Sequence, residues 1–168
     1  MMNIFRLAGD MSHVVSIMVL ILRLRVNKNA TGISLKTQEL FLLVFITRYL
    51  DLFTTFYSVY NSFMKIAYIA STTFIIYMIR FKEPYRSKYD KTQDAFLHVK
   101  FAIAPCAALA CIGCLFKGLF SIIDLLWTFS ILLEAIAIVP QLFVLQRYRE
   151  VENLTAHYVR PSFFFLRE

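Results

Sequence analysis

The sequence has 168 residues, of which 59% are hydrophobic and 17% are charged, and its formal net charge is +7. Because soluble domains are only about 45–50% apolar, this composition excludes a soluble domain and predicts a single polytopic transmembrane domain over 1–168, an all-α membrane protein surrounded by membrane lipid. The positive charge does not indicate a nucleic-acid partner, because the basic residues cluster at the ends of apolar runs, as topology signals do.

Apolar runs long enough to cross a bilayer as helices recur along the whole chain. We expect transmembrane helices at about 4–24, 37–55, 63–79, 95–116 and 119–145. A further apolar run over 158–166 is too short to span alone, so it is expected to be a partial or altered sixth segment. We do not expect the first run to be a cleaved signal peptide, because Asp10 and His13 interrupt its apolar region and no clear small-residue cleavage site follows.

Lysine and arginine are distributed unevenly between the loops that join these runs. The loops after the first, third and fifth runs, with their flanks, contain most of them: Arg23, Arg25, Lys28, Lys36, Arg80, Lys82, Arg86, Lys88, Lys91, Lys100, Arg147 and Arg149. The loops after the second and fourth runs contain only Lys117. By the positive-inside rule, we expect the strongly basic loops to be cytoplasmic and the N-terminus to lie on the opposite side of the membrane.

Arg48 and Asp51 interrupt the second apolar run three residues apart. A charge near the middle of a membrane costs at least about 2.5 kcal/mol and rarely faces lipid. Residues three apart share a face of a helix, so both side chains are expected to point into the protein. Two interpretations follow: an ion pair that only holds helices together, or a polar site for a charged ligand.

Two other runs add polar residues at similar depth, and together the three favour a ligand site. The candidate residues are Arg6, Asp10 and His13 in the first run, Arg48, Tyr49 and Asp51 in the second, and Asp124, Trp127 and Glu134 in the fifth. Arginine clamps carboxylates in bidentate fashion, whereas an aspartate accepts a cation and Trp127 adds a cation–π contact. This mixture of charges suits a mixed-charge ligand such as a peptide better than a neutral sugar.

The sequence offers little that is typical of an enzyme. It contains no recognisable metal-ligand cluster, no glycine-rich phosphate loop and no nucleophile with its base at a meaningful spacing. The three cysteines, Cys106, Cys111 and Cys114, share one apolar run and are interpreted as small core residues rather than a disulfide framework. We therefore expect no catalytic site, no metal and no cofactor.

Several stretches closely resemble the ER lumen protein-retaining receptors, which are also called KDEL receptors. They are Asn-Ile-Phe-Arg-Leu-Ala-Gly-Asp-Met-Ser-His at 3–13, Arg-Tyr-Leu-Asp-Leu-Phe-Thr at 48–54, Trp-Thr-Phe-Ser at 127–130, Glu134, and Pro-Gln-Leu at 140–142. The resemblance runs in order from about Asn3 to Tyr158. It implies a seven-helix bundle similar to SWEET and PQ-loop transporters, with two three-helix repeats, a linking helix and a luminal N-terminus.

The resemblance also implies a function. The family binds the C-terminal Lys/His-Asp-Glu-Leu signal of escaped ER-resident proteins in the mildly acidic early Golgi. It returns them in coat-protein-I vesicles to the endoplasmic reticulum membrane and releases them at neutral pH.

Family roles carry over to single positions of this chain. Arg6 and Arg48 are implied to clamp the ligand's carboxylates, Asp51 and Asp124 to accept its basic residue, Trp127 to form a wall, and His13 to sense protons. Asp10, Tyr49 and Glu134 are implied to be buried polar support. The family usually has glutamate at position 124, and its buried carboxylate at 134 holds an arginine of the sixth helix.

The resemblance ends after His157-Tyr158, where 159–168 replaces the family's last two helices. The second clamp arginine of the sixth helix and the cytoplasmic lysine sorting tail have no counterpart. We therefore expect a C-terminally truncated member with about five complete transmembrane helices, which binds the signal weakly or not at all. Two alternatives are a SWEET or PQ-loop-type transporter of small solutes and a non-binding truncated remnant of the receptor.

Overall fold

The computed structural model describes residues 4–50, 59–118 and 121–149, apart from the side chains of Phe5, Arg6 and Lys117. The elements in chain order are α1 (Ile4–Asn27), α2 (Leu35–Arg48), α3 (Val59–Phe81), α4 (Tyr85–Lys88), the π-helical turn η2 (Val99–Ile103), α5 (Ala104–Lys117) and α6 (Ile122–Ile136). After a turn at 137–138 the chain is helical again over 139–149.

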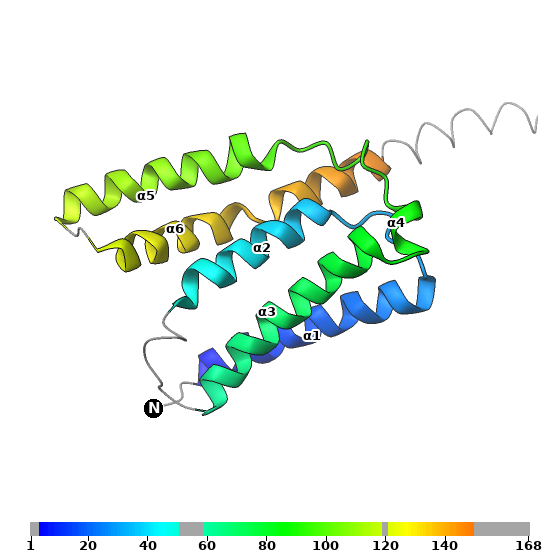
Figure 1. Cartoon of the computed structure of the whole chain (residues 1–168), viewed down its shortest axis with the longest axis horizontal. Coiled ribbons are helices and arrows are strands. Elements are labelled where there is room, and N and C mark those ends of the chain that lie inside the picture. The colour runs from blue at the N-terminus through cyan, green and yellow to red at the C-terminus, as the bar shows by residue number, and fades with distance from the viewer. Residues whose placement is uncertain (1–3, 51–58, 119–120, 150–168) are drawn as a thin grey trace, which may run out of the picture.

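The helices pack side by side in an order that differs from their order in the chain. Figure 1 shows α3 between α1 and α2, and α6 between α2 and α5, and the contacts between elements give the same neighbours. Helix α2 is therefore central, with α3 on one side and α6 on the other. One apolar core joins α2, α5 and α6 around Val44, Ala110 and Leu133. A second joins α1, α3 and the 30–35 loop around Leu24 and Ile75.

Within the described part of the chain, four helical stretches are long and apolar enough to cross a membrane: Leu7–Asn27, Val59–Phe81, Val99–Phe116 and Ile122–Arg149. Large apolar side chains such as Val19 and Ile131 are exposed along them, as expected for helices that face lipid. The prediction of an all-helical membrane protein is confirmed. The predicted run 37–55 extends beyond the described residues at 51–58, and the short segment 158–166 lies wholly outside them. The full count of seven helices stays a prediction.

Helix boundaries follow from local chemistry. The Ser34 hydroxyl accepts a hydrogen bond from the Thr37 backbone at 3.2 Å and so caps the start of α2. Gly118, with φ +65°, ends α5 in the left-handed conformation that glycine adopts without strain. Pro105 and Pro140 lack the N–H of a helix interior. Each proline accordingly follows an irregular turn. The π-helical turn η2 precedes Pro105, and the turn at 137–138 precedes Pro140.

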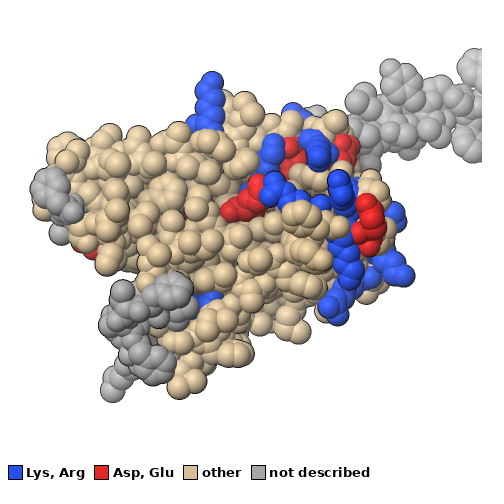
Figure 2. All heavy atoms as spheres, viewed as in Figure 1, with Lys and Arg blue, Asp and Glu red and all other residues tan. Residues whose placement is uncertain are grey.

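Basic residues gather at one end of the molecule. Figure 2 shows Lys and Arg concentrated at the end that carries α4 in Figure 1, while the opposite part is mostly apolar. This distribution agrees with the uneven loops in the sequence. The side of the membrane on which this basic end lies stays a prediction.

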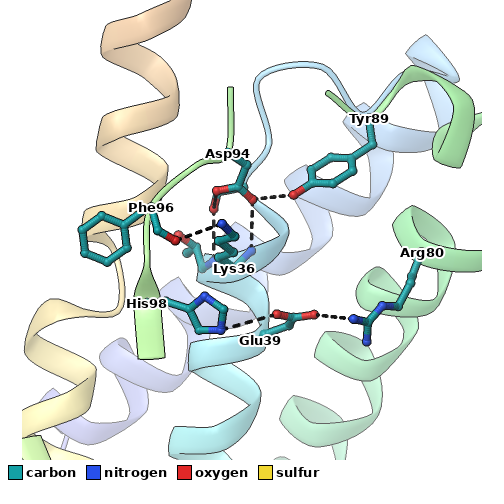
Figure 3. Close-up of polar contacts among 9 residues, drawn as sticks. Lys36, Glu39, Arg80, Tyr89, Asp94, Phe96 and His98 are labelled. Atoms are coloured by element: carbon teal, nitrogen blue, oxygen red, sulfur yellow. Dashed lines mark hydrogen bonds and ion pairs between the residues drawn. The ribbon is translucent and has the colours of Figure 1, made fainter. Parts of the chain in front are cut away.

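A buried carboxylate organises this basic end. Asp94 is 2% exposed and accepts hydrogen bonds from the Ser34 hydroxyl at 2.9 Å, the Lys36 backbone at 3.3 Å and the Tyr89 hydroxyl at 2.6 Å (Figure 3). Burial, together with the hydrogen bond to Asp94, raises the pKa of Tyr89 above its usual range, so this phenol stays a donor. Asp94 thereby ties the start of α2 to the segment that leads into α5.

Two further residues, Gln141 and Glu39, strengthen the same end. Gln141 accepts from the Ser34 backbone at 2.8 Å and donates to the Gly32 carbonyl at 2.7 Å, which joins the helix over 139–149 to the loop before α2. Glu39 of α2 lies 3.5 Å from an Arg80 nitrogen of α3 and 3.9 Å from His98 (Figure 3).

Replacing Asp94 tests this arrangement. Asp94→Ala is expected to lower the free energy of unfolding by roughly 3 kcal/mol, because three donors lose their acceptor inside the protein. Thermal unfolding in detergent measures the effect. The control is Asp90→Ala, since the exposed Asp90 carboxylate accepts from Thr92 in its own turn; it is expected to leave stability nearly unchanged. Equal losses in the two variants would contradict a special role for Asp94.

Candidate functional site

Arg48, the last residue of α2, crosses to α6. Its Nη1 lies 2.6 Å from Oε2 of Glu134, and its Nε donates to the Ser130 hydroxyl at 3.2 Å. The Ser130 hydroxyl in turn donates to the Trp127 carbonyl at 2.7 Å. The Arg48 side chain is 21% exposed and that of Glu134 is 49% exposed. The family resemblance implies an arginine of a later helix as the partner of Glu134, whereas among the described residues its partner is Arg48.

The Arg48 guanidinium is only partly paired within the described part of the chain. Its Nη2 is buried and has no hydrogen-bond partner among the described residues. A buried N–H group without an acceptor costs about 1–3 kcal/mol, so this position favours an acceptor that is added from outside. A carboxylate is the best match, because guanidinium and carboxylate form charge-assisted, often bidentate, hydrogen bonds.

Asp10 and His13 form a second polar cluster between α1 and α3. Tyr60 donates to Oδ2 of Asp10 at 3.2 Å, and Tyr68 donates to its Oδ1 at 3.2 Å and to its backbone carbonyl at 3.1 Å. The His13 ring meets the Tyr68 ring edge to face at 4.9 Å. Its Nε2 is buried and lacks a partner among the described residues. Asp10 is half-buried and accepts hydrogen bonds from two tyrosines of α3, and its role as polar support stays a prediction.

An aromatic row connects the two clusters. The Phe45 ring of α2 lies 5.4 Å from the His13 ring and stacks 5.8 Å from the ring of Tyr49. Lys65 of α3 is 7% exposed and places its Nζ 5.4 Å from the Tyr49 ring centroid. The rings of Phe45 and Tyr49 thus form a packed row from His13 to the end of α2, where Arg48 lies.

The remaining predicted residues are placed as follows. Asp124 is half-buried and Trp127 is 54% exposed, both in the first half of α6. Asp51 and the side chain of Arg6 lie outside the described part of the chain. The structure thus brings Arg48 and Glu134 together, and Asp10 and His13 together. The roles of Asp51, Asp124 and Arg6 stay predictions.

Sequence reasoning missed three hydroxyls that complete these clusters. Ser130 is fully buried. It lies four residues before Glu134, and this spacing indicates that both residues share one face of a helix. Tyr60 and Tyr68 recur about two turns apart on α3, which places both on the face that meets Asp10. Tyrosine in an apolar run is usually read as packing, so its role as a donor appeared only with the structure.

Groups of three or more residues suited to hold a metal ion are absent from the described residues. What the site offers instead is a set of charges and donors on α1, α2, α3 and α6. Such a set has the chemistry that suits a charged ligand.

Comparison with known proteins assigns a family. Residues 29–165 match the family model described as ER lumen protein retaining receptor. The chain is 49% identical over 158 residues to the ER lumen protein-retaining receptor of Petunia hybrida, which covers 94% of this chain and 72% of that protein. It is 50% identical, with the same coverage, to ER lumen protein-retaining receptor A of Arabidopsis thaliana. It is 47% identical over 165 residues to ER lumen protein-retaining receptor 2 of Gallus gallus, which covers 98% of this chain and 73% of that one.

A double-mutant cycle tests the link between α2 and α6. We expect Arg48→Gln and Glu134→Gln to show a coupling of about 1 kcal/mol in the free energy of unfolding, a value reduced by the exposure of Glu134. Thermal unfolding of the two single variants and the double variant gives the coupling. The control pairs Arg48→Gln with Asp124→Asn, roughly 15 Å earlier on the same helix, and their effects should add. Additive effects for Arg48 and Glu134 would show that their contact contributes nothing.

Proposed function

We propose a mechanism of ligand capture from the premise that this chain belongs to the family of ER lumen protein retaining receptors. It is a multi-pass membrane protein of the ER and Golgi system, and its family is a receptor family rather than an enzyme family. Its function is to bind retrieval signals of ER-resident luminal proteins. By its resemblance to the KDEL receptors, the signal is a C-terminal Lys/His-Asp-Glu-Leu.

The mechanism rests on the partly paired guanidinium of Arg48. Glu134 and Ser130 hold two of its nitrogens, and the buried Nη2 is left for an acceptor. We propose that the terminal carboxylate of the signal supplies this acceptor. Because Arg48 is already held, little side-chain entropy is lost when the ligand arrives, and preorganisation of this kind raises affinity.

The other predicted residues complete the ligand's recognition. In this proposal Arg6 clamps a second carboxylate, Asp51 and Asp124 accept the basic side chain of the signal, and Trp127 forms a wall. Support comes from the charge pattern: a ligand that is basic at one end and acidic at the other requires carboxylates and guanidiniums in one site.

We further propose that His13 makes binding depend on pH. An imidazole titrates near 6.5 in water, between a mildly acidic and a neutral compartment. A charged His13 beside Asp10 gains a favourable partner, whereas a neutral His13 leaves Asp10 to the tyrosines alone. Protonation in the early Golgi then favours the state that holds ligand, and neutral pH in the endoplasmic reticulum favours release. Return in coat-protein-I vesicles and a luminal N-terminus belong to this proposal.

Peptide binding at two pH values tests the function. The full chain in detergent is expected to bind a labelled peptide ending in Lys-Asp-Glu-Leu more tightly at pH 5.5 than at pH 7.4, because a larger fraction of imidazole is charged at the lower pH. His13→Asn removes the titrating group and should abolish most of that ratio, while His98→Asn at the basic end should preserve it. A ratio that survives His13→Asn would refute the role of His13. Uptake of small solutes without peptide binding would favour a transporter, and neither activity would indicate a non-binding remnant.

A further inference from the structure

An open apolar groove lies at the basic end of the molecule, away from Arg48. It has a volume of about 360 Å³, within the range of small-molecule sites. The segment 93–101 forms one side and the helix over 139–149 forms the other. Its wall includes Phe96, Leu97, Phe101, Pro140 and Phe143, with Arg147 among the lining residues.

The wall is mostly aromatic and preformed. The Phe96 ring lies 5.3 Å from the ring of Phe143 and 6.2 Å from the ring of Phe101. Phe101, Phe143 and Leu97 remain exposed, at 57%, 45% and 60% respectively. Three large apolar side chains around one hollow indicate an apolar occupant rather than water.

The polar part of the groove is positive. The Arg147 guanidinium donates through Nη1 to the Thr92 carbonyl at 2.8 Å, which holds the exposed side chain at the groove. Lys100 places its Nζ 5.8 Å from the Phe101 ring centroid, and Lys36 donates to the Phe96 carbonyl at 2.9 Å. The described lining residues include no carboxylate. An anion is therefore the matching polar group.

The groove also lies at the membrane depth that suits an amphiphile. Phe101 lies near the start of the apolar stretch Val99–Phe116, and Phe143 lies near the end of Ile122–Arg149. Arg147 follows Phe143 by about one helical turn, toward the basic end that Figure 2 shows. The apolar wall is thus at the edge of the hydrocarbon, and the guanidinium is at the level where lipid phosphates lie.

We propose that this groove binds one anionic phospholipid of the adjacent leaflet, with an acyl chain against Phe101 and Phe143 and the phosphate at Arg147. The site is separate from the peptide site and goes beyond the proposed function. The ligand combines an apolar chain with a negative head group, and each half matches one part of the groove.

Native mass spectrometry of the full chain, titrated with phosphatidylserine in detergent, tests this inference. We expect one tightly bound lipid, with an affinity about fivefold weaker in Arg147→Gln, the usual contribution of one basic residue at a charged membrane surface. Arg147→Lys should retain most of the affinity, which separates loss of charge from misfolding. Phe143→Gln should also weaken binding, although it leaves every charge in place.

The matched control is Arg25→Gln, which removes the same charge from α1. Helices α3 and α2 separate α1 from the helix over 139–149 (Figure 1). Three helix spacings of about 8–10 Å each exceed the Debye length of about 8 Å at physiological salt. This control should therefore change affinity less than twofold. Equal losses in Arg25→Gln and Arg147→Gln would show diffuse attraction only and overturn the proposal. Equally tight binding of soluble phosphoserine, or of phosphatidylcholine, would overturn it as well.

Discussion

A guanidinium inside a bundle that faces lipid must be paired, and the arrangement of this molecule follows from how Arg48 is paired. The arginine ends α2, and its partners Glu134 and Ser130 belong to α6. The contact therefore holds the group α1, α2 and α3 against the later helices. Together with the apolar core around Val44 and Leu133, the contact sets the position at which the two groups meet.

Helix α2 is held at both ends by polar contacts and along its length by apolar ones. At its start, Asp94 accepts from Ser34, Lys36 and Tyr89. At its end, Arg48 meets α6, and between the two Val44 packs in the core. A ligand that binds at Arg48 acts on a helix whose other end is anchored. The row from His13 through Phe45 to Tyr49 adds a lateral contact from α1. The chemistry proposed here therefore depends on one rigid helix and on the groups that meet its last turn.

The sequence predicted much of this, and the reasons for the rest are physical. Charges inside apolar runs identified Arg48, Asp10 and Glu134, because such charges are costly and need an interior partner. Their pairing was not predictable, since helix order in space differs from order in the chain. Asp94 was overlooked because it lies in a polar loop, where a carboxylate is ordinarily solvated. Its burial arises only when the loops before α2 and α5 meet.

If Nη2 of Arg48, which is unpaired among the described residues, receives the terminal carboxylate of the ligand, then blocking that carboxylate must weaken binding. Affinities of two peptides ending in Lys-Asp-Glu-Leu, one with a free C-terminus and one amidated, test it directly at acidic pH. The wild-type chain should bind the free acid at least about tenfold more tightly, the usual contribution of a charged hydrogen bond. In Arg48→Gln that preference should largely disappear. A preference of the same size in both proteins would contradict the account.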